Sequence, residues 1–81
     1  MKLAQAIKNV VYRITAIERE AASEIFSKKL FHLGVMEGVE VVLKHKAPIF
    51  GNPLLIEIDS LQIAMTKSEA NLISIEEKKD S

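Results

Sequence analysis

Residues 23–46, SEIFSKKLFHLGVMEGVEVVLKHK, contain the change of periodicity that decides the fold. The first half places apolar side chains three or four positions apart, which is the spacing of one face of a helix. This apolar stripe consists of Phe26, Leu30 and Leu33, with Ile25 beside it. The pattern predicts a helix over residues 23–33, in which Ser23 caps the first turn. Gly34 follows directly, and glycine most easily takes the left-handed conformation that ends a helix.

The second half alternates apolar and polar residues, which is the pattern of a half-buried strand. A turn at Glu37-Gly38 separates this strand from the helix. One face of the strand carries Val39, Val41 and Leu43, and His45 is in phase with this face. The opposite face carries Glu40, Val42, Lys44 and Lys46. Residues 47–53 contain two prolines and form a loop, because proline cannot donate a hydrogen bond to a sheet.

Two more strands are predicted over residues 54–58 and 61–65, where the alternation resumes. The dipeptide Asp59-Ser60 between them is typical of a tight hairpin turn. The inward positions of this hairpin are Leu54, Ile56, Ile58, Leu61, Ile63 and Met65, and Leu55 points outward. The sequence therefore predicts an antiparallel pair with one apolar face.

The two flanks of the chain add a strand each. β-Branched and aromatic residues favour a strand over residues 10–18, and Asn9 is the turn residue between it and a short N-terminal turn. Near the other end, a single helical turn over residues 68–71 precedes a strand over residues 72–75. This gives four or five short strands and one principal helix.

A mainly β chain of this kind is expected to form a small, partly open barrel, because closure hides the edges that an open sheet exposes. The length of 81 residues allows one small domain, which we expect over residues 1–76 with a solvated tail over residues 77–81. No stretch is apolar for long enough to span a membrane or to form a signal peptide. We therefore expect a soluble, cytoplasmic protein that reaches a membrane only through a partner.

The composition excludes most catalytic and metal-binding chemistry. There is no cysteine, which excludes disulfides, cysteine-ligated zinc, iron–sulfur clusters and thiol catalysis. The two histidines, His32 and His45, have no second ligand at a metal-binding spacing, so we expect no metal site and no cofactor. Ser23, Ser60 and Ser68 each fit a cap or a turn, so nucleophilic catalysis is not expected either. The sequence therefore predicts that the protein is not an enzyme.

The charge balance argues against binding to nucleic acid. Eleven Lys and Arg residues balance eleven Asp and Glu residues, so no overall field attracts a polyanion. A local group of basic residues comprises Lys28, Lys29, Lys44 and Lys46, but Glu37 and Glu40 dilute it. Aromatic residues, which would stack on bases, make up only 5% of the chain. We expect these lysines to be solvated.

Six apolar residues fall outside the helical and strand core patterns and form a candidate partner-binding site. They are Val35, Met36, Ile49, Phe50, Leu55 and Val42. Val35 and Met36 lie between turn glycines, and Ile49 and Phe50 are expected at the tip of the proline loop. Leu55 and Val42 are expected to point outward from strands. Contiguous apolar surface of this kind is typical of a protein-binding site. We predict one patch with Phe50 as its anchor, the alternative being that Met36 and Phe50 close the ends of the barrel.

In combination, these motifs resemble the FeoA family, ferrous iron transport protein A. The residues that carry the resemblance are Leu30, Leu33, Gly34, Gly38, Val39, Val41, Ala47, Pro48, Gly51, Asn52, Pro53, Ile63, Met65, Glu69, Ala70 and Ile73. Three positions depart from the family pattern, with Glu37 at a frequent proline, Ser60 at a usual glycine and Thr66 at a common arginine. The first two departures are expected to loosen turns.

The resemblance implies an SH3-like barrel and an accessory role in ferrous iron uptake. It implies a protein-interaction module that binds or regulates FeoB, the membrane transporter with a cytosolic GTPase domain, and it assigns the movement of iron to FeoB. The alternative is an SH3-like small barrel with a regulatory role in iron-dependent transcription or in nucleic-acid binding. A third class of function is that of a metal carrier, in which this protein itself would bind ferrous iron. Weak homo-oligomer formation is left open.

Overall fold

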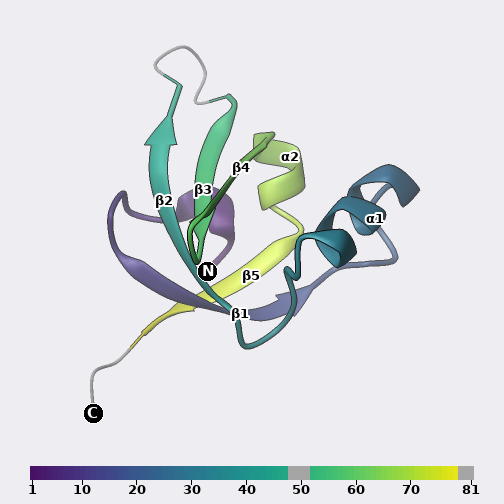
Figure 1. Cartoon of the computed structure of the whole chain (residues 1–81), viewed down its shortest axis with the longest axis horizontal. Helices are drawn as coiled ribbons and strands as arrows, with labels where there is room; N and C mark the ends of the chain where they lie inside the picture. The colour runs from purple at the N-terminus through teal and green to yellow at the C-terminus, as the bar shows by residue number, and fades with distance from the viewer. Residues whose placement is uncertain (48–51, 79–81) are drawn as a thin grey trace.

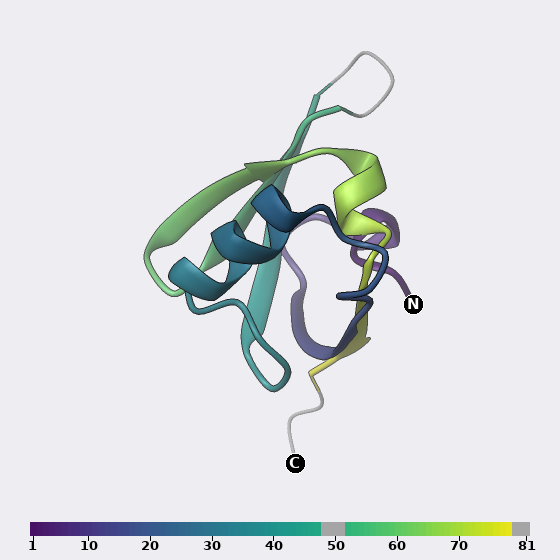
Figure 2. The same ribbon diagram turned by 90° about the vertical axis from the view of Figure 1, so that its right-hand side faces the viewer.

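Five antiparallel strands form one sheet in the order β4-β3-β2-β1-β5 (Figure 1). The structure is a computed structural model, and it describes residues 1–47 and 52–78. The strands are β1 (Val11–Ile17), β2 (Glu40–Lys46), β3 (Leu54–Ile58), β4 (Leu61–Met65) and β5 (Ile73–Glu77). A 3₁₀ turn, η1 (Leu3–Gln5), precedes them, and two helices, α1 (Glu24–His32) and α2 (Lys67–Ala70), complete the fold. The sheet is curved, and α1 lies beside the hairpin of β3 and β4 (Figure 2).

The inner face of the sheet carries one continuous core. Its largest fully buried side chains are Tyr12, Leu3, Ile14, Leu43, Leu54, Ile56, Ile73 and Val41. The predicted alternation is confirmed for β3, which buries Leu54, Ile56 and Ile58. From α1, Phe26 and Leu30 enter the core as expected, at 2% and 4% exposure. Ile25 does not join them, because its helical phase directs it away from the stripe.

The predicted helix and its signals are confirmed. The Oγ of Ser23 accepts a hydrogen bond from the backbone N–H of Phe26 at 3.1 Å and so caps α1. Gly34 has φ +75° directly after the helix, as a glycine terminator requires. Asn9 and Asp59 also take positive φ, at 68° and 55°, in the two turns assigned to them.

A β-bulge in β2 overturns the strict alternation predicted for that strand. The pairing of β2 with β3 shifts between Leu43 and His45, so that His45 lies opposite Leu55 and Lys46 lies opposite Leu54. A bulge inserts one extra residue, and every later side chain then changes face. His45 is therefore on the outer face rather than in phase with Leu43. Lys46, expected on the outer face, donates a hydrogen bond from its Nζ to the carbonyl oxygen of Ala4 at 3.4 Å.

Three further details differ from the sequence-based expectation. Leu61, expected to face inward, is 42% exposed, because it lies beside the hairpin turn, where β4 begins. The helix α2 starts at Lys67, because Thr66 and Glu69 form a capping box in which each side chain accepts a backbone N–H of the other. Strand β5 continues to Glu77, beyond the expected end at residue 75.

Candidate partner-binding site

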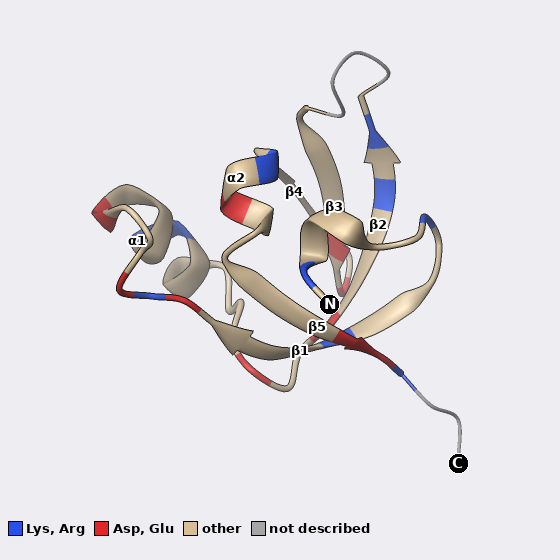
Figure 3. Cartoon of the chain, turned by 180° about the vertical axis from the view of Figure 1, so that it is seen from behind, with Lys and Arg blue, Asp and Glu red and all other residues tan. Residues whose placement is uncertain are grey.

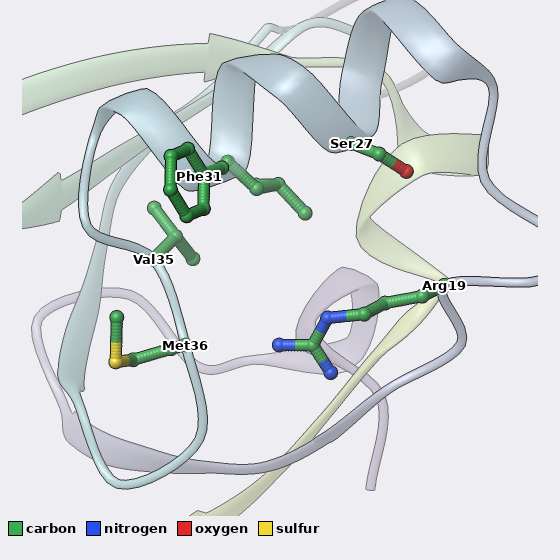
Figure 4. Close-up of a pocket in the computed structure, with 6 residues that line it drawn as sticks. Arg19, Ser27, Phe31, Val35 and Met36 are labelled. Carbon is green, nitrogen blue, oxygen red and sulfur yellow. The ribbon is translucent and has the colours of Figure 1, made fainter.

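A pocket of about 260 Å³ lies between α1 and the turn that leads into β2 (Figure 4). It is lined by Arg19, Ser27, Leu30, Phe31, Val35 and Met36. Leu30 and Val35 are nearly inaccessible, at 4% and 3% exposure, and provide an apolar floor. Phe31 and Met36 are 78% and 49% exposed and form its accessible rim. This combination of a buried apolar floor with a large exposed aromatic is suited to receive an apolar side chain from another protein.

The end of α1 fixes the shape of the pocket. The N–H of Val35 donates to the carbonyl oxygen of Leu30 at 2.9 Å, and the N–H of Gly34 donates to the carbonyl oxygen of Phe31 at 3.2 Å. These two bonds are the Schellman arrangement, which folds the chain back over the last helical turn. An apolar contact between the residue after the glycine and the last turn commonly accompanies it. The motif therefore places Val35 beside Leu30.

The same motif corrects the role predicted for Val35. The predicted patch required this side chain to be on the surface, but it is only 3% exposed and belongs to the core. The sequence signal was present, because an apolar residue directly after a helix-ending glycine occupies the position that packs back on the helix. Among the four described residues of the predicted set, Met36 is the one that is both exposed and part of the pocket.

A two-pronged ion pair closes one side of the pocket. Arg19, from the segment after β1, contacts Glu37 through Nη1–Oε2 at 2.6 Å and Nη2–Oε1 at 2.8 Å. The hydrogen bond from Arg19 lowers the pKa of Glu37 to about 2, and the same bond raises the pKa of Arg19. The backbone N–H of Gly38 also donates to the carbonyl of Ile14 at 2.8 Å. Glu37, expected to loosen this turn, ties it to the other side of the pocket.

Val42 and Leu55, two further residues of the predicted patch, do not line this pocket. Val42 and Leu55 are half-buried on β2 and β3. Ile49 and Phe50 lie outside the described residues, so the anchor role of Phe50 stays a prediction.

Sequence reasoning missed Phe31, the most exposed residue of the pocket rim. Its ring lies edge-on to that of His32, with centroids 5.8 Å apart and planes at 74°. The available signal was helical phase, because Phe31 follows the buried Leu30 by one position and so cannot share its face. A large aromatic off the apolar stripe of a short helix is a candidate contact residue for this reason.

Within residues 1–47 and 52–78, no three His, Asp or Glu side chains are placed to hold a metal ion together. The basic residues predicted as one local group are divided between α1 and β2, which lie on different sides of the molecule (Figure 3). In the same two segments, no helix has the length and apolar character needed to cross a membrane.

The model of the FeoA domain matches residues 1–77. This chain belongs to the FeoA family. A candidate Fe(2+) transport protein A from Helicobacter pylori is 32% identical over 77 residues, which cover 95% of this chain and 97% of that protein. The resemblance drawn from the sequence motifs is therefore confirmed.

Solved FeoA structures have the same fold. Iron(II) transport protein A from Clostridium thermocellum superposes with a TM-score of 0.82 at 32% identity, over 95% of this chain. This chain spans 45% of the length of that solved chain. FeoA from Stenotrophomonas maltophilia, solved with zinc and described as an SH3 domain protein, gives a TM-score of 0.79 at 25% identity over 94% of this chain and 89% of its own. The chain is thus a small SH3-like protein of a family associated with ferrous iron transport.

Proposed function

We propose that this protein is a cytosolic, non-catalytic accessory factor of ferrous iron uptake that binds a FeoB-type membrane transporter. Its membership of the FeoA family supports the connection with ferrous iron transport. The observation that carries the binding role is the pocket at the end of α1, where the exposed Phe31 and Met36 border a buried apolar floor. The cytosolic part of the transporter would supply an apolar side chain to this pocket.

The pocket is held in shape before a partner arrives. The Schellman turn fixes Val35 against Leu30, and the ion pair of Arg19 with Glu37 holds the turn from the other side. Binding to a preformed site loses less conformational entropy than binding to one that must first order itself. Phe31 is the expected anchor, because aromatic residues near the centre of an interface contribute a large share of its binding energy.

The proposal treats iron as the cargo of the transporter and not as a ligand of this chain. The described residues contain no cluster of three potential ligands, so the side chains present favour protein contact over metal transfer. The description of the Stenotrophomonas maltophilia protein as a candidate ferrous iron transport activating factor agrees with an accessory role.

Capture of the transporter from native membranes tests the proposal. A tagged full-length chain is incubated with detergent-solubilised membranes, and the transporter is quantified by immunoblot. Phe31→Ala is expected to reduce capture about tenfold or more, as loss of an interface anchor does. Ile25→Ala is the matched control, because Ile25 is on the same helix and 83% exposed but does not line the pocket. Equal capture by wild type and Phe31→Ala would contradict the proposed binding site.

A further inference from the structure

The two outer edges of the sheet differ in how they are protected. The outer edge of β5 is covered by the N-terminal segment, where Ile75 N–H donates to Met1 O at 2.8 Å and Lys2 pairs with Ser74. Within residues 1–47 and 52–78, no strand pairs with the outer edge of β4. Exposed edges attract further strands, and proteins normally cover or charge them. The edge of β4 therefore requires a separate explanation.

The backbone groups of β4 that point outward can be identified. The carbonyl oxygen of Ala64 accepts a hydrogen bond from the Nζ of Lys29 in α1 at 2.9 Å, so the Ala64 peptide groups point away from β3. Outward and inward groups alternate along a strand, so those of Gln62 also point outward. The N–H and carbonyl of Gln62 and the N–H of Ala64 make no hydrogen bond among residues 1–47 and 52–78. Both residues are exposed.

A cavity of about 410 Å³ lies at the hairpin end of this edge. Its lining residues are Leu33, Gly34, Val39, Ile58, Asp59, Ser60 and Leu61. Leu33 comes from the end of α1, whereas Leu61 is the first residue of β4 and is 42% exposed. The edge of β4 therefore has two features. Helix α1 reaches this edge at Ala64 through the side chain of Lys29, and an apolar depression lies at its first residue, Leu61.

The charge beside the edge indicates what could bind there. Four ion pairs occur in the described part of the chain, and they engage Lys2, Arg19, Lys28 and Lys78 but not Lys29. The ammonium group of Lys29 thus lies at an open strand edge with a neutral carbonyl as its partner. A carboxylate on an incoming strand would form a stronger, charge-assisted bond with the same group.

We propose that β4 accepts an extended peptide segment as an additional strand, and that this segment carries an acidic residue opposite Lys29. Its backbone would bond to Gln62 and Ala64, as in other complexes formed by strand addition. An apolar side chain of the segment would enter the depression beside Leu33 and Leu61. This surface is separate from the pocket of Phe31 and Met36, so the proposal does not depend on the function assigned to that pocket.

A titration monitored by NMR tests this proposal on the full, ¹⁵N-labelled chain. The probe is a blocked nine-residue peptide of alternating threonine and valine with one central glutamate. The expected result is a downfield shift and slower hydrogen exchange of the Gln62 and Ala64 amides. Lys29→Gln is expected to weaken binding about two- to fivefold, as for one exposed ion pair. Lys28→Gln is the matched control, because Lys28 already pairs with Glu24 at 3.3 Å.

Three results would overturn the proposal. One is the absence of amide shifts in β4, or shifts confined to Phe31 and Met36. Another is equal binding of a control peptide whose central glutamate is replaced by lysine, since the acidic requirement would then be wrong. The third is a concentration-dependent shift of the Gln62 and Ala64 amides without any peptide, which would identify a second copy of the chain as the occupant of the edge.

Discussion

Replacing Leu30 with alanine measures how strongly α1 is attached to the sheet. Leu30 is 4% exposed and belongs to the core, and it also forms part of the pocket floor. Truncation removes about three carbon groups worth roughly 0.8 kcal/mol each, or about 2.4 kcal/mol of transfer free energy. A cavity left in the core would normally increase this loss. Here the cavity opens into the existing pocket, so we expect its additional cost to be small. We expect Leu30→Ala to destabilise the protein by about 2–3 kcal/mol.

This loss is large relative to the stability of so small a protein. A chain of 81 residues is expected to have a free energy of unfolding of about 4–12 kcal/mol. Urea denaturation followed by circular dichroism measures the change, and at a slope of about 1 kcal/mol per molar the midpoint should fall by about 2 M. Ile25→Ala, at an 83% exposed position of the same helix, should change stability by less than about 0.5 kcal/mol. A loss below about 0.5 kcal/mol for Leu30→Ala would show that α1 does not pack on the sheet.

Three other predictions follow from the turns and the charges. Glu37→Gln should lower the melting temperature at neutral pH, because the pKa of Glu37 is depressed from 4.5 to about 2 and its ion pair stabilises the fold above pH 4.5. The difference between the two proteins should shrink as the pH falls from 4.5 towards 2, and a pH-independent difference would contradict this. Gly38→Ala should cost about 1–2 kcal/mol in urea denaturation, because Gly38 has φ +91° and alanine is strained there even though open space surrounds it; unchanged stability would refute this. Calorimetric titration with ferrous iron or zinc should detect only weak binding, through surface carboxylates or His32, and a tight one-to-one site would overturn the expectation of no metal site.

Local signals predicted most of the fold. Ser23 and Gly34 define the ends of α1 through a cap and a positive φ, both of which depend on residues next to each other in sequence. The hairpin of β3 and β4 follows from alternation and from Asp59 at its turn. These features are encoded within a few residues, so they can be recognised without knowledge of the tertiary structure.

The bulge in β2 could not be predicted, because it depends on how β2 pairs with β3 rather than on its own composition. It moves His45 to the outer face and directs Lys46 towards Ala4. The candidate site was only partly predictable for a related reason. Met36 was recognised from its apolar character in a turn, and the helical phase could have identified its neighbour Phe31. Arg19 could not be recognised, because its place in the pocket depends on the tertiary contact with Glu37.

The central claim is that the pocket at the end of α1 binds the transporter. The most direct measurement is an NMR titration of the ¹⁵N-labelled chain with the purified cytosolic domain of a FeoB-type transporter. We predict saturable shifts centred on Phe31, Met36 and Arg19, and a dissociation constant raised about tenfold or more by Phe31→Ala but unchanged by Ile25→Ala. Absence of binding, or saturable shifts that leave Phe31 and Met36 unaffected, would contradict the account.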